Sequence, residues 1–125
     1  MSLTRERIVE AVQHYFAAVD AGDVEATVAC FAPDAWLRCE NVDQEFSGHT
    51  AIRQFYARSA GLTTGMLHEV QRVVVDCEAG RAACELRSAD TLQDATAYDL
   101  DNCNFFDFDA AGRFTRVHCW LGDPL

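Results

Sequence analysis

The fold is decided by residues 12–59, which read VQHYFAAVDAGDVEATVACFAPDAWLRCENVDQEFSGHTAIRQFYARS. Together with the residues just before it, this stretch places apolar side chains at helical spacing on one face, namely Ile8, Ala11, Val12, Tyr15, Phe16 and Val19. Thr4 is placed to cap this helix, and Gly22 stops it. Asp23 then caps a second, shorter helix that runs through Phe31. The sequence therefore predicts two consecutive helices before the first strand.

The rest of the chain is predicted to add one more helix and a series of strands. A short strand is expected through about residue 40, with a partner strand at residues 45–46. A third helix begins at Ser47 or Gly48 and is followed by a flexible link at residues 61–65. Further strands are expected at residues 66–76, 82–92, 97–108 and 114–121. Three helices followed by hairpin-connected strands indicate an α+β fold, with the helices on one face of a curved sheet.

The composition is that of one globular domain spanning residues 1–125. Twenty acidic and ten basic residues give a formal net charge of -10. A field of this sign repels phosphate backbones and anionic lipid surfaces, which argues against nucleic acid and membrane partners. An uncharged or cationic small molecule is compatible with it. The alternative is that the charge only keeps an exposed face soluble.

The six cysteines and four histidines show no spacing typical of a metal site. None of the cysteines belongs to a C-x-x-C pair, and the opening MSLTRERI lacks the apolar stretch of a signal peptide. We therefore expect a cytoplasmic protein in which most cysteines are small buried hydrophobes. No cofactor is predicted.

The quoted stretch resembles the first half of bacterial ketosteroid isomerase and, more broadly, the nuclear transport factor 2-like superfamily with its SnoaL-like polyketide cyclases. The resemblance covers residues 4–60 well and 102–122 moderately. It implies a cone in which three N-terminal helices pack on a strongly curved, mainly antiparallel sheet and enclose a pocket. In this family the pocket is the active site, and the outer sheet face commonly forms a dimer.

The family shifts a double bond next to a ketone, using an Asp base while a Tyr and a protonated Asp hold the enolate oxygen. By resemblance, Tyr15 in QHYFAA matches the oxygen-holding tyrosine, and Tyr56 in RQFYARS matches its supporting tyrosine. The base position falls on Cys39, and the protonated acid falls on Asn104. A thiol is mostly protonated at neutral pH and cannot directly replace the base, whereas Asn still donates a hydrogen bond. The alternatives are a structural Tyr15 and a Cys39 that only lines the pocket wall.

Two residues are candidates for the missing base. His68 shares a predicted strand face with Met66 and Val74, and an imidazole suits proton transfer near neutral pH. The alternative for His68 is a buried histidine satisfied by a neighbour. Glu40 follows Cys39, but strict alternation points it to the opposite face, so it reaches the pocket only if the strand bulges there.

Apolar residues complete the predicted ligand-binding set. Phe55 lies on the inner face of the third helix, Met66 shares the face of His68, and Phe106 and Leu121 match family positions by resemblance. We also expect a homodimer through the outer face of residues 82–92 and 105–120. Phe105 points outward there, and Trp120 faces either the helices or the dimer partner.

Two classes of function follow from these residues. The first is an isomerase, cyclase or hydratase acting on an apolar carbonyl-bearing molecule, with Tyr15, Asn104 and His68 as catalytic residues. The second is a non-catalytic module whose pocket holds a ligand or only supports dimerisation. The lack of a carboxylate at Cys39 favours the second and predicts negligible ketosteroid isomerase activity. The retained Tyr15, Tyr56 and Asn104 favour a ligand.

Overall fold

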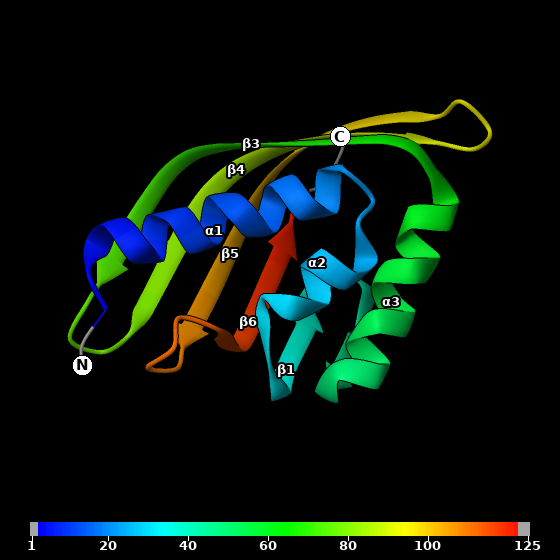
Figure 1. Cartoon of the computed structure of the whole chain (residues 1–125). Coiled ribbons are helices and arrows are strands. Elements are labelled where there is room, and N and C mark those ends of the chain that lie inside the picture. Colours follow the sequence, from blue (N-terminus) through cyan, green and yellow to red (C-terminus); the bar gives the residue numbers. More distant parts are fainter. Residues whose placement is uncertain (1–2, 123–125) are drawn as a thin grey trace.

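The computed structural model describes residues 3–122, and in them three α-helices and a short 3₁₀ helix accompany a six-stranded sheet (Figure 1). In chain order the elements are α1 (Arg5–Asp20), α2 (Val24–Ala29), β1 (Phe31–Cys39), η1 (Glu40–Val42), β2 (Gln44–Ser47), α3 (Gly48–Leu62), β3 (Thr63–Asp76), β4 (Arg81–Leu92), β5 (Ala97–Phe108) and β6 (Phe114–Leu121). The α-helices lie within the curve of the sheet. The predicted α+β cone is confirmed.

Both N-terminal helices begin at the predicted capping residues. The side chains of Thr4 and Asp23 each accept a hydrogen bond from the backbone N–H three residues later, at 3.2 and 3.0 Å. Gly22 lies between the two helices with φ of +67°, a left-handed conformation that costs glycine little. The second helix is shorter than predicted, because it ends at Ala29 and Phe31 already begins β1.

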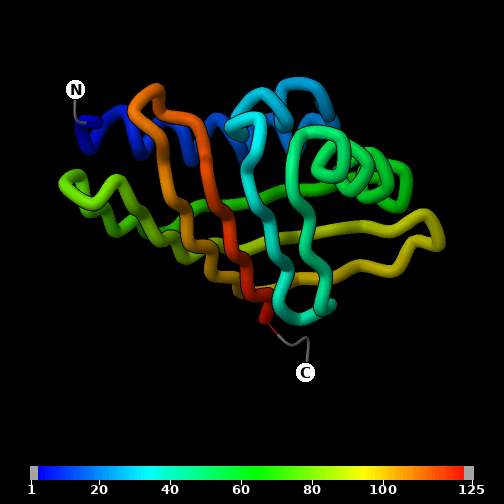
Figure 2. Tube along the Cα trace, turned by 90° about the horizontal axis from the view of Figure 1, so that it is seen from below, coloured from blue at the N-terminus to red at the C-terminus, as the bar shows by residue number. Residues whose placement is uncertain are grey.

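The strand order across the sheet is β2-β1-β6-β5-β4-β3. β1 pairs with β6 in parallel, and every other neighbouring pair is antiparallel. Figure 2 shows β1, β6 and β5 side by side, while the β4–β5 hairpin extends toward the side where α3 lies. The sheet is therefore mainly antiparallel, as predicted, and its one parallel pair joins the first strand to the last.

β3 differs from the prediction in two respects, namely the residue at which it starts and the side of the sheet to which its later side chains point. α3 runs directly into β3, so the expected link at residues 61–65 does not form. A register shift between Val70 and Arg72 marks a β-bulge against β4. A bulge inserts one extra residue and reverses the alternation beyond it. As a result Val74, predicted to share the inner face of His68, is 62% exposed.

Aromatic rings form the centre of the core. Phe31, Phe106 and Phe114 are at most 1% exposed, and the ring of Tyr15 meets each of them edge-on at 5.3–6.0 Å. Each such pair adds about 0.5–1.5 kcal/mol beyond the burial of its area. Phe106, predicted as a ligand contact, lies in this core and not in the cavity wall, because neighbouring rings enclose it on the helix side.

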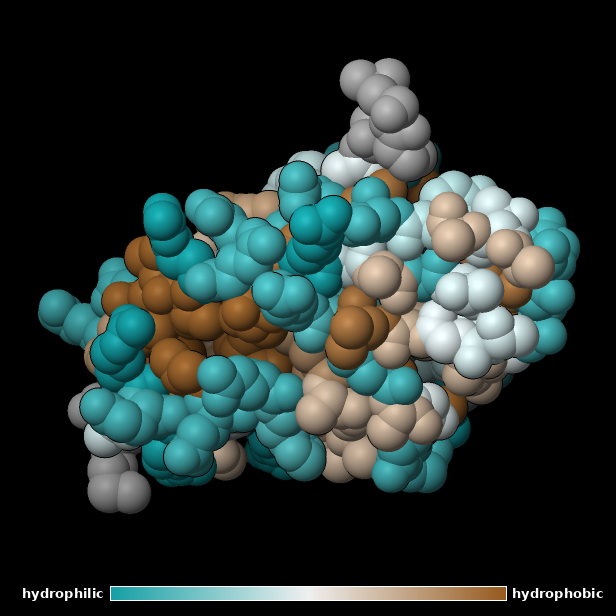
Figure 3. Space-filling view, turned by 90° about the horizontal axis from the view of Figure 1, so that it is seen from above, coloured by the Kyte–Doolittle hydropathy of each residue, from teal (hydrophilic) through white to brown (hydrophobic). Residues whose placement is uncertain are grey.

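The outer face of the sheet carries exposed apolar side chains. Phe105 and Trp120 are 47% and 38% exposed, and their rings meet at 5.5 Å. Trp120 therefore faces away from the helices. Leu67 and Val74 of β3 are also exposed. Figure 3, a view from above, shows a hydrophobic area framed by hydrophilic side chains. None of the helices within residues 3–122 is long and apolar enough to cross a membrane.

Candidate functional site

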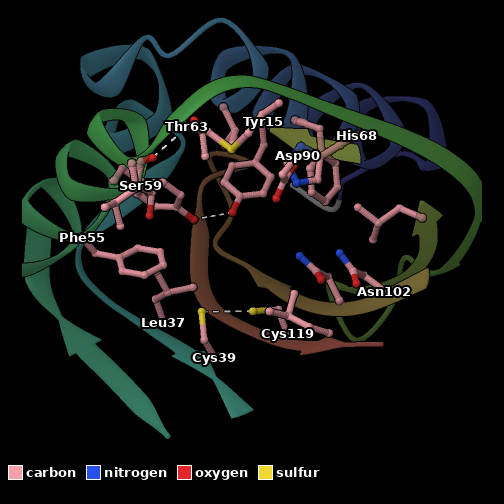
Figure 4. Close-up of a pocket in the computed structure, with 18 of the residues that line it drawn as sticks. Tyr15, Leu37, Cys39, Phe55, Ser59, Thr63, His68, Asp90, Asn102 and Cys119 are labelled. Carbon is pink, nitrogen blue, oxygen red and sulfur yellow. Dashed lines mark hydrogen bonds between the residues drawn. The ribbon is translucent and has the colours of Figure 1, made fainter. Parts of the chain in front are cut away.

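A cavity of about 270 Å³ lies between the inner face of the sheet and α1 and α3. Its wall is mostly apolar and contains Tyr15, Phe16, Val19, Leu37, Cys39, Phe55, Tyr56, Ser59, Leu62, Thr63, Met66, His68, Leu86, Asp90, Leu92, Asn102, Asn104, Cys119 and Leu121. Figure 4 shows polar groups from α1, β3 and β4 on one side and from β1, β5 and β6 on the other. An apolar cavity with a few convergent polar groups is the usual form of a small-molecule site.

Most of the residues predicted for the site lie in this wall. They are Tyr15, Cys39, Phe55, Tyr56, Met66, His68, Asn104 and Leu121. Phe106 is the exception, for the reason given above. Two further acidic residues, Asp20 and Asp90, were not predicted and lie beside His68.

The hydroxyl groups of Tyr15 and Tyr56 are hydrogen-bonded to each other. Both side chains are buried, and burial raises the pKa of each phenol well above 10.0. The pair is therefore neutral at physiological pH. Since one hydroxyl donates to the other, the pair keeps one further O–H with which it can donate to a ligand.

Asp20, the last residue of α1, holds both the backbone and the ring of His68. Its carboxylate accepts hydrogen bonds from the backbone N–H of His68 at 2.9 and 3.1 Å and contacts the ring Nδ1 at 2.5 Å. An ionised carboxylate only accepts hydrogen bonds, so Nδ1 carries a proton and the neutral ring keeps its lone pair on Nε2. The ring also stacks on Phe16 at 5.2 Å. His68 thus has a fixed orientation, and its Nε2 has no hydrogen-bond partner among residues 3–122.

Asp90 brings a second carboxyl group to the same side of the cavity. It pairs with Met66 across the β3–β4 ladder while His68 pairs with Ser88, so Asp90 and His68 are diagonal neighbours on the inner face. Its Oδ1 is buried and has no hydrogen-bond partner within the described residues. Burial raises the pKa of this carboxyl, and the nearby His68 partly offsets that rise. Asp90 therefore holds a proton more readily than an exposed aspartate.

Two amides of β5 face these groups. The Asn102 amide donates to Ser88 Oγ at 3.1 Å and accepts from the Gly122 backbone N–H at 3.2 Å, so both its ends are already occupied. Asn104 lies two residues further along the same face and is 6% exposed. Asp99, on the opposite face of β5, forms an exposed ion pair with Arg87 at 2.6 Å.

Glu40 does not enter the cavity. Its carboxylate contacts Arg38 at 2.7 Å and His118 at 2.6 Å on the other side of the sheet. These contacts hold the pKa of Glu40 at about 2, with the hydrogen bond from Arg38 as the largest cause. The 3₁₀ turn at Glu40–Val42 follows Cys39 without the bulge that would have turned Glu40 inward.

Asp20 and Asp90 each left a weak signal in the sequence. Asp20 lies four residues after Phe16 on the inner face of α1, and Asp90 alternates with Leu86 and Ser88 on β4. Neither signal separates a cavity carboxylate from one at the solvent edge. Within residues 3–122, no three His, Cys, Asp or Glu side chains come close enough together to hold a metal ion.

The sequence profile of the SnoaL-like domain matches residues 12–117, which is most of the chain. The chain belongs to the SnoaL-like family. The cavity described above is therefore the inner cavity of a SnoaL-like domain, bounded by α1 and α3 on one side and by the sheet on the other.

Three solved structures share the fold at low sequence identity. A protein from Catenulispora acidiphila with a ketosteroid isomerase-like fold, in complex with trimethylamine, is 13% identical, with a TM-score of 0.83 over 90% of this chain and 85% of that one. SalBIII, an epoxide hydrolase/cyclase-like enzyme of pyran ring formation in salinomycin, is 19% identical, with a TM-score of 0.83 over 94% and 92%. An epoxide hydrolase from M. tuberculosis is 17% identical, with a TM-score of 0.80 over 93% and 83%.

Proposed function

We propose that this SnoaL-like protein is an acid–base enzyme, an isomerase, cyclase or hydratase, acting on a small apolar molecule that bears a carbonyl or related oxygen. The observation that carries the proposal is the arrangement of Asp20, His68 and Asp90 at one side of the cavity. His68 is oriented by Asp20 to accept a proton, whereas burial raises the pKa of Asp90 and so favours its protonated form. Paired groups whose surroundings push them toward opposite protonation states are typical of acid–base sites.

His68 acts as the base in this proposal. With Nδ1 bonded to Asp20, Nε2 takes a proton from a carbon next to the carbonyl or from a hydroxyl group or water that attacks the substrate. The positive charge that the ring then gains is stabilised by the Asp20 carboxylate at 2.5 Å. Asp20 is therefore a positioning residue, which fixes the tautomer of His68 and offsets its charge.

Asp90 acts as the acid, and the neutral donors hold the substrate oxygen. Burial raises the pKa of Asp90, and a substrate that closes the cavity strengthens this effect, so that Asp90 can take up a proton and return it to the substrate. The Tyr15–Tyr56 pair supplies one free O–H, and the Asn104 amide supplies N–H donors. Donors directed at an oxygen that gains charge lower the barrier for enolate-like transition states.

The reactions named for two of the structural neighbours are of the same general kind as the proposed reaction. SalBIII is described as an epoxide hydrolase/cyclase-like enzyme that acts in pyran ring formation, and the M. tuberculosis protein as an epoxide hydrolase. Both descriptions concern transformations at an oxygen-bearing carbon. By resemblance the family's base position falls on Cys39, which is not a carboxylate, so we propose that proton transfer takes place at β3 and β4, where His68 and Asp90 lie.

Deuterium exchange tests the proposal without knowledge of the natural substrate. The probe is 2-tetralone, a small apolar ketone whose α-hydrogens exchange in D₂O once a base removes them, and NMR follows the exchange. We expect exchange above the buffer rate with the wild-type protein and its loss in His68→Asn, in which the amide keeps a donor for Asp20. Asp99→Asn, which removes an exposed carboxylate outside the cavity, is the matched control and should exchange like wild type.

The same preparation separates an enzyme from a binder. 2-Naphthol, an apolar phenol, reports occupancy of the cavity through its fluorescence. Binding of 2-naphthol together with exchange that His68→Asn abolishes supports the proposal. Binding of 2-naphthol with exchange no faster than in buffer overturns it and leaves the non-catalytic ligand-binding module.

A further inference from the structure

The opposite wall of the cavity holds two thiols that the proposed acid–base chemistry does not use. Cys39 ends β1 and Cys119 lies on β6, and the parallel register of these strands pairs the two residues directly. The Cys119 thiol donates a hydrogen bond to the Cys39 sulfur, with 3.2 Å between the sulfurs (Figure 4). Both side chains are buried in the fold yet line the cavity, so a small solute in the cavity reaches them.

The two sulfurs are not equivalent. The hydrogen bond from Cys119 lowers the pKa of Cys39, and the charge of Arg38 acts in the same direction against the opposing effect of burial. The same hydrogen bond and burial raise the pKa of Cys119. Of the pair, Cys39 is therefore the sulfur that loses its proton first, and Cys119 keeps its proton longer. Thiolates, not thiols, are the nucleophiles in cysteine oxidation.

Three other cysteines have the opposite character. Burial raises the pKa of Cys30 to about 11 and that of Cys84 to about 12. It also raises the pKa of Cys103. These thiols stay protonated near neutral pH, whereas Cys39 has a proton donor in direct contact with its sulfur.

We propose that Cys39 and Cys119 form a peroxide-reactive dithiol that closes to a disulfide across β1 and β6. The Cys39 thiolate attacks one oxygen of hydrogen peroxide, the O–O bond breaks, and hydroxide leaves, so that Cys39 becomes a sulfenic acid. The Cys119 sulfur then attacks the Cys39 sulfur and the S–O bond breaks. The hydroxyl group leaves as water with the Cys119 proton. In sum, two thiols and one peroxide give one disulfide and two waters.

The backbone already suits this bond. Neighbouring strands lie about 4.8 Å apart, and disulfides form at Cα separations of about 4.4–6.8 Å. The sulfurs need to approach from 3.2 Å to a bond length of about 2.05 Å, which is a side-chain movement. The proposal does not depend on the acid–base function, because neither thiol takes part in it.

Peptide mapping tests the proposal on the wild-type protein. The reduced protein is treated with hydrogen peroxide, its remaining thiols are alkylated, and it is digested with trypsin without reduction. Cleavage after Arg38, Arg53 and Arg116 places the two residues in peptides 39–53 and 117–125, and neither peptide contains another cysteine. We expect these peptides to be joined, with a loss of two hydrogens in the intact mass, and to separate after treatment with dithiothreitol.

Two serine variants identify the order of events. In Cys119→Ser the resolving thiol is gone, so Cys39 should stop as a sulfenic acid that dimedone labels. In Cys39→Ser dimedone should not label Cys119. Cys103→Ser, a half-buried cysteine outside the pair, is the control and should still form the joined peptides. Two results would overturn the proposal. One is oxidation of other cysteines before Cys39. The other is oxidation of Cys39 to a sulfinic acid in the wild type while Cys119 remains a free thiol.

Discussion

Tyr15 lies where the aromatic core meets the cavity, and its hydroxyl bonds to that of Tyr56. Tyr15→Phe keeps the ring and removes one hydrogen bond. Because Tyr56 also borders the cavity, water can replace the lost partner, and we expect a stability loss of only about 0.5–1.5 kcal/mol. The affinity for 2-naphthol should fall by roughly the same free energy, up to about ten-fold. Chemical denaturation and fluorescence titration measure the two effects.

The exposed Tyr98 of β5 gives the matched control, since Tyr98→Phe should change neither quantity. A stability loss of about 1–3 kcal/mol in Tyr15→Phe with unchanged affinity would mean that Tyr15 is structural and that its partner is left unpaired.

Asp90 should lower the stability of the protein at neutral pH. Burial raises its folded pKa above 3.8, so the ionised form is penalised in the folded state but not in the unfolded one. This cost is absent below about pH 3.8, grows as pH rises from there to the folded pKa, and stays constant above it. Asp90→Asn should therefore melt higher than wild type near pH 7, and the difference should shrink as pH falls toward about 3.8.

Asp99→Asn should behave oppositely, because Arg87 lowers the pKa of Asp99 and its removal costs stability at neutral pH. Equal effects of the two variants on the melting temperature near neutral pH would contradict the environment assigned to Asp90.

The sequence predicted the residues of the cavity wall better than the proposed acid–base group. Tyr15, Tyr56 and Asn104 were found because they repeat spacings of the family. The contact of Asp20 with His68 joins the end of α1 to β3 across 48 residues, and Asp90 approaches from a third element. Periodicity reports which face a residue lies on, but not which faces meet.

At the scale of elements, Glu40 connects the end of β1 to β6 through its contacts with Arg38 and His118. Arg38 and His118 hold its folded pKa at about 2, below the ordinary value of 4.5. The ionised carboxylate thus stabilises the fold fully above about pH 4.5, and this contribution is lost as pH falls from there toward about pH 2. Glu40→Gln should be less stable than wild type near pH 7, with a difference that narrows below about pH 4.5. Melting curves across this range measure it, and a constant difference would refute the assignment.

The accuracy of the strand predictions also differs between elements for physical reasons. β5 and β6 begin and end where predicted, because the turn between them contains Gly112 at φ of +85°, which marks the break between the two strands in the sequence. β3 was predicted less well. Gly61 and Gly65 suggest a break, yet the helix and the strand absorb both, and the bulge near Arg72 depends on pairing with β4. Local sequence does not contain that information.

At the scale of the molecule, the outer sheet face bears on assembly. Phe105 and Trp120 lie edge-on in its middle, and Trp120 stacks on His118 at 3.8 Å. Exposed aromatic clusters on a sheet are typical of interfaces between subunits. A two-fold interface uses the same patch twice, so each substitution acts at two places. We therefore predict a homodimer through this face.

Phe105→Arg tests this dimer, because it places two charges where two aromatic rings would be buried. If each ring contributes about 2 kcal/mol as a central interface residue, the variant loses ~4 kcal/mol, or roughly a thousand-fold in the dimer Kd. Light scattering at micromolar concentration should then report a dimer for wild type and a monomer for Phe105→Arg. Tyr98→Arg changes an exposed residue that strand alternation places on the opposite face of β5 from Phe105, and it should stay dimeric. A wild-type monomer would refute the interface, and dissociation of both variants would place it elsewhere. The cavity opens on the other side of the sheet, so a monomeric Phe105→Arg should still bind 2-naphthol.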